Sequence, residues 1–106
     1  MPYIKQEDRD VLDDQINMLA SSIKGVIKKY GYDGAFAGIL NYTVTRLALA
    51  VIPARRYWAI ALVCGVFDNI KAEFYRRYAV PYENEQICNN GDVEGYDPPA
   101  NTLPSR

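Results

Sequence analysis

Arginine and tyrosine side chains occur together at two places in this sequence, and both residue types are suited to binding an anion. Tyr42 and Arg46 are four residues apart in "LNYTVTRL", so on a helix the guanidinium can lie over the ring. The second place is "EFYRRYAVPY", residues 73–82, where two adjacent arginines stand among three tyrosines. Arginine binds phosphate through paired hydrogen bonds, and tyrosine stacks on flat bases. The candidate binding residues are Tyr42, Arg46, Glu73, Tyr75, Arg76, Arg77 and Tyr82.

The same residues also fit a structural role. Glu73 lies three residues before Arg76 and can pair with it along the helix, or reach Arg46 on another helix. The helical angle predicts that Arg77 leans toward the packed side while Arg76 faces the opposite stripe, so that the two arginines cannot serve one contact. Basic residues are also common at a helix C-terminus, where the dipole favours them. A binding pocket and an ion-pair network that fixes helix packing therefore both remain open.

Residues typical of catalysis or metal binding are scarce. The chain has no histidine, no serine or cysteine has a recognisable base beside it, and no glycine-rich loop follows a strand. Cys64 and Cys88 are widely separated and form no CxxC pair, which predicts neither a disulfide framework nor a metal site. We therefore expect a protein that is not an enzyme and needs no cofactor or metal.

Charge is unevenly distributed along the chain. The net charge is −1, but residues 16–79 carry +6 while residues 1–15 carry −3 and residues 80–106 carry −4. Such asymmetry indicates either an anion-binding face or acidic ends that fold back on a basic body. A pI near 5.3 argues against a dedicated DNA-binding domain.

Three helices must position these residues. Apolar residues recur at helical spacing from Leu12 to Tyr30, which predicts a first helix. We expect Asp13 to be its N-cap and residues 5–12 to form a separate short turn. The glycines of "YGYDG" are expected to end the helix. A second helix is expected from between Gly34 and Gly38 to Ile52, where Pro53 stops it. A third is expected over about 54–78, ended by Pro81, which turns Tyr82 back toward the other helices. The prediction is an all-α, three-helix bundle-like domain with a short N-terminal turn.

The second and third helices each carry two apolar stripes. On the second helix, the row that includes Leu40 and Leu47 is accompanied by another that includes Tyr42 and Leu49, and on the third helix Trp58 and Leu62 lie opposite the main row. A helix that is apolar nearly all round must be covered nearly all round. We therefore expect a homo-oligomer in which the second stripes meet. The alternative is a monomer whose C-terminal segment covers them.

The ends of the chain are expected to be simpler. After Pro81 the hydrophobic period is lost, apart from a possible helical turn around 83–87, and glycines and prolines break regular structure. We predict one domain over residues 1–92 and an extended or mobile tail over 93–106. No signal peptide is evident at the N-terminus, and Asn41 and Arg46 interrupt the apolar stretch 35–54, so we expect a cytoplasmic protein that is not membrane-bound.

Several segments resemble a family of small uncharacterised proteins found in tailed phages, prophages and microbial genomes. They are "PYIKQEDR", "LNYTVTRL", "KAEFYRRYAVPYE" and "NNGDV", and the resemblance covers most of residues 2–93 while departing in the 31–39 loop and after Val93. The resemblance implies no active site. It singles out matching positions on the second and third helices and just beyond: Asn41, Tyr42, Thr45, Arg46, Glu73, Phe74, Tyr75, Arg76, Arg77, Pro81, Tyr82, Glu83, Asn90, Gly91 and Asp92.

Three functions are compatible with these observations. The first is a non-enzymatic helical interaction protein, for which the resemblance suggests a phage origin, that binds a protein partner or a small anionic ligand at its Arg/Tyr surface. The second is a sponge that sequesters a nucleotide signal of host defence, which a phage setting would suit by analogy. The third is a nucleic-acid accessory protein.

Overall fold

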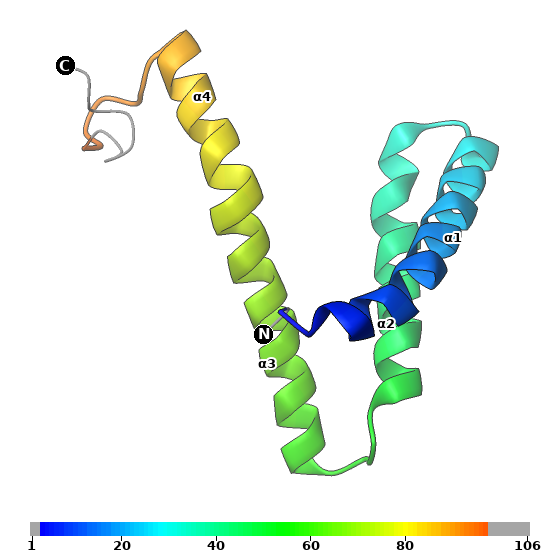
Figure 1. The fold of residues 1–106 in the computed structure, drawn as a ribbon. Helices are drawn as coiled ribbons and strands as arrows, with labels where there is room; N and C mark the ends of the chain where they lie inside the picture. Colours follow the sequence, from blue (N-terminus) through cyan, green and yellow to red (C-terminus); the bar gives the residue numbers. More distant parts are fainter. Residues whose placement is uncertain (1–2, 98–106) are drawn as a thin grey trace. The chain divides into compact units, whose positions relative to one another are not determined.

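The structure, a computed structural model, describes residues 3–97, and these residues form helices and connecting segments with no strand. The helices are α1 (Gln6–Tyr30), α2 (Phe36–Val51), α3 (Tyr57–Phe74) and α4 (Val80–Asn90), with a 3₁₀ turn η1 (Asp33–Ala35) and a π-helical turn η2 (Tyr75–Ala79) between them (Figure 1). The all-α prediction is confirmed. The chain divides into two compact units, residues 1–64 and 65–106.

Helix α1 starts earlier than the sequence predicts. Its first residue is Gln6, it follows the extended backbone of Lys5, and Asp13 lies well inside it, so the predicted cap and the separate N-terminal turn are both wrong. Two side-chain hydrogen bonds lie at this helix start: the amide of Gln6 donates to Asp10 at 2.9 Å, and Arg9 Nε donates to the carbonyl of Ile4 at 2.9 Å. Neither bond satisfies a backbone N–H of the first turn, where no side-chain cap is present.

The other ends of α1 and α2 follow the sequence signals. Gly31 closes α1 in the left-handed region, with φ 84°, and its N–H bonds to the carbonyls of Ile27 and Lys28. Helix α2 ends at Val51, and Ile52 takes up an extended conformation with ψ 125°, as the residue before a proline must. Both helix ends are confirmed.

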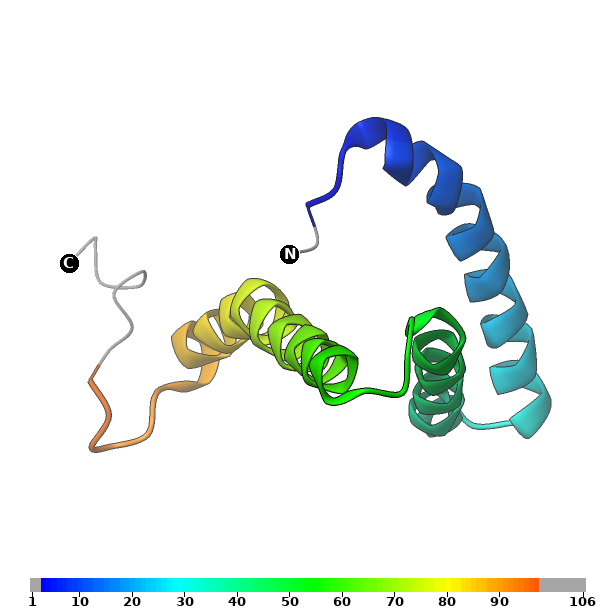
Figure 2. The same ribbon diagram turned by 90° about the horizontal axis from the view of Figure 1, so that it is seen from below.

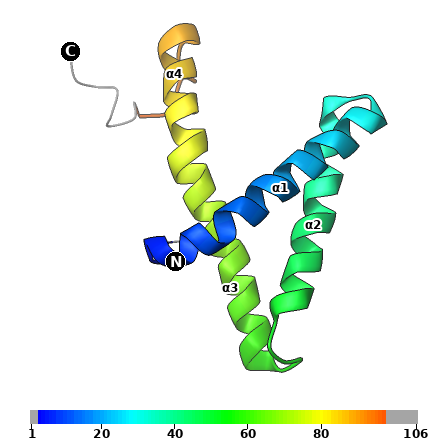
Figure 3. The same cartoon turned by 45° about the vertical axis from the view of Figure 1, so that its right-hand side comes forward.

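Helices α1 and α2 form a hairpin around η1. They lie together near the turn and diverge away from it, so that the N-terminal half of α1 extends beyond α2 (Figures 2 and 3). Ala35 in η1 is buried, and Ile23 and Ile27 on α1 and Ile39 on α2 are half-buried. The hairpin is therefore held together mainly at its closed end.

Pro81 does not end the third helix. The backbone continues from α3 through η2 into α4 without a break, in segments of 18, 5 and 11 residues, so the predicted stop and the predicted turning back of Tyr82 are wrong. A proline inside an α-helix lacks the N–H donor, and its ring clashes with the carbonyl four residues earlier, here that of Arg77. The π turn lies just before Pro81, and the N–H of Val80 bonds to the carbonyl of Tyr75, five residues back. This wider turn accommodates the proline.

The segment after α4 is irregular over the described residues 91–97, with Gly91 at φ 90° closing the helix. The predicted tail mostly covers residues 98–106, which lie outside the described part of the chain. Two predictions concern how the two units fit together: the single domain over 1–92, and the packing of the third helix against the first two. Both remain predictions.

One helical segment of the described residues, Asp33–Val51, is long and apolar enough to cross a membrane, with a mean hydropathy of 1.3. A single segment of this kind is weak evidence, because core helices of soluble proteins pass the same test. The polar side chains of this segment are bonded within the helix itself: Thr43 donates to the carbonyl of Ile39 at 2.8 Å, and Thr45 to that of Asn41 at 2.7 Å.

Candidate functional site

The seven predicted site residues fall into two groups. Tyr42 and Arg46 lie on α2, in the first unit, while Glu73, Tyr75, Arg76, Arg77 and Tyr82 lie on α3, η2 and α4, in the second. A single pocket built from both groups, including a pair between Glu73 and Arg46, therefore remains a prediction. Each group has a geometry of its own.

Tyr42 and Arg46 are in contact, as their spacing predicts. Arg46 Nη1 donates to the Tyr42 hydroxyl at 2.7 Å, and the guanidinium carbon lies 5.7 Å from the ring centroid. Both side chains are exposed, so the cation–π contact contributes on the order of 0.5–1 kcal/mol. Within the described part of the first unit Arg46 has no carboxylate in ion-pair range.

A groove of about 590 Å³ runs between α1, η1 and α2, and Tyr42 forms part of its wall. Its lining is mostly apolar, with three tyrosines and two small residues near the turn. The lining residues are Leu19, Ser22, Ile23, Val26, Tyr30, Tyr32, Gly34, Ala35, Gly38, Ile39, Tyr42 and Thr43. The volume lies in the range of small-molecule pockets, and the open end of the hairpin leaves the groove accessible.

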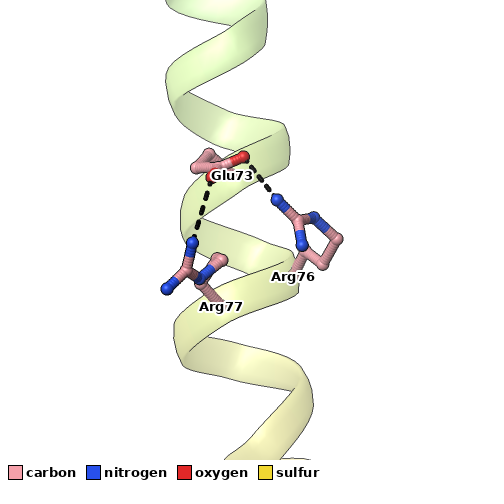
Figure 4. A network of polar contacts seen from close by, with 3 residues as sticks. All are labelled: Glu73, Arg76 and Arg77. Atoms are coloured by element: carbon pink, nitrogen blue, oxygen red, sulfur yellow. Dashed lines mark hydrogen bonds and ion pairs between the residues drawn. The ribbon is translucent and has the colours of Figure 1, made fainter. Parts of the chain in front are cut away.

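Glu73 binds both arginines of "EFYRR" (Figure 4). Arg76 Nη2 lies 2.7 Å from Glu73 Oε1, and Arg77 Nη1 lies 3.7 Å from Oε2. The predicted Glu73–Arg76 pair is confirmed, but the prediction that the two arginines diverge to different contacts is wrong. Residues three and four positions along a helix lie on either side of the same neighbour, and long arginine side chains reach back to it. The cluster carries one net positive charge.

Tyr75 is bonded to Glu83, a residue that the family resemblance singles out but that is not one of the seven candidate binding residues. Its hydroxyl donates to Glu83 Oε2 at 2.8 Å, eight residues further on. In an α-helix two turns take about 7 residues, so a residue eight positions further on does not lie directly on the same side of the helix. The π turn between them contributes the extra residue and brings Glu83 under Tyr75. This pair could be foreseen only by assuming a helix that continues through Pro81.

The pair also changes the acidity of Tyr75. The hydrogen bond to Glu83, and then the negative charge of that carboxylate, raise the pKa of the Tyr75 hydroxyl above its ordinary value of 10.0. Tyr75 therefore stays protonated and acts as a hydrogen-bond donor. Tyr82, by contrast, is 60% exposed and makes none of the hydrogen bonds or ring contacts found among the described residues.

A hollow of about 550 Å³ lies where the chain leaves α4, beside the Tyr75–Glu83 pair. It is lined by polar side chains and by the residues that follow the helix, and both tyrosines and carboxylates contribute. The lining residues are Tyr75, Glu83, Gln86, Ile87, Asn90, Gly91, Asp92, Val93 and Tyr96. The "NNGDV" segment thus forms one wall of this hollow.

The described part of the chain contains no group of three or more histidine, cysteine, aspartate or glutamate residues able to hold a metal ion. Cys64 and Cys88 are both exposed and are not joined in a disulfide.

Comparison with known proteins gives one family. The model of the family described as "Domain of unknown function (DUF6899)" matches residues 1–93. No curated protein and no solved structure matches the chain. The match covers both groups of candidate residues and ends at the "NNGDV" segment.

Proposed function

The chain belongs to this family of unknown function, and we propose that it is a non-enzymatic helical interaction protein that acts as a homo-oligomer in the cytoplasm. The observation that carries the proposal is the exposure of its apolar side chains. Of the apolar residues between 3 and 97, only Ala35 and Ala59 are buried, and no large side chain is fully buried. A folded helical protein needs a larger core than this to offset the entropy of ordering its chain.

The exposed residues include both apolar stripes predicted for α2. Leu40 and Leu47 of the first stripe are 46% and 51% exposed, and Tyr42 and Leu49 of the second are 62% and 69% exposed. Within the first unit α1 lies against one side of α2, so the other side needs a further protein surface. A second copy of the chain supplies such a surface at the same concentration as the first.

Helix α3 supports the same conclusion. Trp58 and Leu62 are 57% and 63% exposed, and Ile70 and Phe74 on the other stripe are 55% and 60% exposed. A Cβ added to Gly65 would meet no atom within 4 Å, so another backbone has room to approach there. Burial of aromatic and aliphatic side chains of this kind typically dominates the energy of an obligate interface.

Thermal unfolding at several protein concentrations tests the proposal. An oligomer that unfolds to separate chains has a melting temperature that rises with protein concentration, because association binds the folded state. We expect such a rise over a hundredfold range of concentration, accompanied by a single cooperative transition. A melting temperature that does not depend on concentration would argue for a monomer.

A second candidate function is the binding of a small anionic ligand, such as a cyclic or linear nucleotide, at Tyr42 and Arg46. The observation that favours it is the exposed guanidinium, which is held by Tyr42 at 2.7 Å and has no carboxylate partner among the described residues of the first unit. The Tyr42 ring also forms part of the wall of the apolar groove, which could hold a flat base beside the phosphate. If the source is a phage, such a protein could act as a sponge for a host signalling nucleotide.

Differential scanning against a panel of nucleotides tests this candidate. A specific ligand at a concentration of a hundred times its dissociation constant stabilises the folded protein by about 2.7 kcal/mol through mass action. The melting temperature rises accordingly. Arg46→Gln should abolish the shift while leaving the melting temperature without ligand nearly unchanged, because Arg46 is exposed. Lys71→Gln, which removes an exposed cation from α3, is the matched control. The absence of a shift with every nucleotide would rule out the sponge.

A further inference from the structure

The charges of α1 are sorted along its length. Residues 6–14 carry five acids and one arginine, whereas residues 15–30 carry three lysines and no acid. The helix therefore has a negative first third and a positive last part. Its acids are Glu7, Asp8, Asp10, Asp13 and Asp14, and its lysines are Lys24, Lys28 and Lys29.

The helix dipole accounts for only part of this pattern. Acids in the first turn and bases in the last turn are favoured by the dipole, and Glu7, Asp8, Lys28 and Lys29 occupy those turns. The effect fades within one turn of each end. Asp13, Asp14 and Lys24 lie further in, so their segregation needs another reason.

Contacts within the chain do not supply that reason. Asp14 has no basic residue, and Lys24 no acid, three or four positions away on α1. Asp13 has Arg9 four positions before it, but Arg9 Nε donates to the carbonyl of Ile4. The ion pairs found between residues 3 and 97 involve Glu73 and its arginines, not these groups. Within the first unit, as far as the structure describes it, only Asp10 and Arg9 among the charged residues of α1 have a side-chain hydrogen bond, to Gln6 and Ile4, and none of them forms an ion pair.

An exposed apolar surface runs between the two charged ends. Val11 and Met18 are seven residues apart and 71% and 67% exposed, and Leu12 and Leu19 form a parallel row at 46% and 37%. Seven residues make nearly two helical turns, so each row runs along one side of the helix. These rows continue past the part of α1 that contacts α2, since the groove with α2 begins only at Leu19.

From these observations we infer that α1 pairs in antiparallel orientation with α1 of a second copy of the chain. Antiparallel pairing sets the acidic end of each helix against the basic end of the other, and the twofold symmetry makes both ends equivalent. Parallel pairing would set like charges together along the whole interface. The inference rests on the proposed homo-oligomer and specifies which surface forms it.

The same pairing gives the apolar groove an occupant. The groove lies against the C-terminal half of α1, and in an antiparallel pair the partner's N-terminal half lies alongside that half. Leu12 and Ile16, which are 46% and 56% exposed and do not line the groove of their own chain, are then placed to enter the groove of the other copy. Each hairpin thus covers the open end of its partner.

Charge reversal tests the pairing. The variant Asp10→Lys/Asp13→Lys/Asp14→Lys makes α1 basic throughout, and Lys24→Glu/Lys28→Glu/Lys29→Glu makes it acidic throughout. At low salt each variant alone should associate at least about tenfold more weakly than the wild type, and an equimolar mixture should recover wild-type association as a heterodimer. A chain with all six changes should again form homodimers. Arg55→Glu/Arg56→Glu, which reverses two exposed charges outside α1, is the control and should associate as the wild type does.

Cysteine crosslinking tests the direction. In a Cys64→Ser/Cys88→Ser background, Met18→Cys, at the midpoint of α1, should form a disulfide-linked dimer, while Val11→Cys should not, because antiparallel helices bring only their midpoints together. Equal crosslinking of both variants would show parallel pairing and overturn the inference. If the wild type is oligomeric and neither charge variant associates more weakly, the α1 pairing is wrong while the oligomer stands. A monomeric wild type, with helical content confirmed by circular dichroism, would overturn both.

Discussion

At the scale of residues, the second unit contains two separate polar clusters on one continuous helical segment. Glu73 holds Arg76 and Arg77, and Tyr75 holds Glu83, so within "EFYRR" the glutamate, the tyrosine and both arginines all have side-chain partners. This arrangement favours a role in shaping the helix over a role as a ready anion site. Arg46, with only Tyr42 beside it, is the better candidate for an anion.

Tyr75 should titrate differently when Glu83 loses its charge. Glu83→Gln removes the negative charge and weakens the hydrogen bond, so the pKa of Tyr75 should fall toward 10.0. Ultraviolet titration of tyrosinate measures the change, and Tyr75→Phe identifies which of the tyrosines is responsible. Because the folded-state pKa is raised above the unfolded value, the stabilisation is fully present below about pH 10 and is lost as pH rises through the folded-state pKa. Identical titration curves for the wild type and Glu83→Gln would contradict the hydrogen bond.

Glu73→Gln should destabilise the fold only slightly. The side chains of Arg76 and Arg77 are 66% and 60% exposed, and such exposed ion pairs contribute between 0 and about 1 kcal/mol each. Urea unfolding at low and high salt measures the loss, which should shrink as salt screens the charges. Glu85→Gln, an exposed acid on α4, is the control. A loss well above about 2 kcal/mol would mean that the cluster is buried in the assembled protein.

At the scale of elements, the helix ends show which sequence signals are dependable. Gly31 and Pro53 end their helices as predicted, because a left-handed C-cap and the residue before proline depend on local backbone sterics alone. Asp13 does not cap α1, because the helix begins at Gln6 and Asp13 lies in its interior. Pro81 was misread because a π turn relieves the clash that normally stops a helix.

Gly31→Ala should destabilise the hairpin by about 1 kcal/mol. The φ of Gly31 is 84°, which a residue with a Cβ adopts at a cost, while no atom lies within 4 Å of the added methyl group, so the cost is purely one of backbone conformation. Gly31→Asn should lose less, because asparagine tolerates the left-handed region. Chemical unfolding of the two variants compares them, and equal stability of Gly31→Ala and the wild type would contradict the observed cap.

Pro81→Ala should convert the π turn into ordinary α-helix. The restored N–H can bond to the carbonyl of Arg77, and stability should rise by about 1–3 kcal/mol, because proline is the least favourable residue in a helix interior. Removing the extra residue from the turn rotates Glu83 by about 100° away from Tyr75. The pKa of Tyr75 should then fall toward its ordinary value, as in Glu83→Gln. A raised pKa of Tyr75 that persists in Pro81→Ala would show that the proline does not maintain the π turn.

At the scale of the whole molecule, the sequence predicts the helices better than it predicts what covers them. The hydrophobic period marks the apolar faces of α1, α2 and α3, and the doubled stripes already indicate a need for an outside partner. The identity of that partner cannot be read from the period, because a second copy and an unrelated protein bury the same side chains. The segregated charges of α1 are the feature of the sequence that favours a second copy.

The oligomeric state of the purified chain tests the account most directly. Light scattering on a size-exclusion column gives the mass independently of shape, so an extended monomer is not mistaken for a dimer. The exposure of nearly all large apolar side chains predicts a mass that is a whole multiple, two or more, of 12.0 kDa at micromolar concentration. A single species of 12.0 kDa across the accessible concentration range would contradict the account.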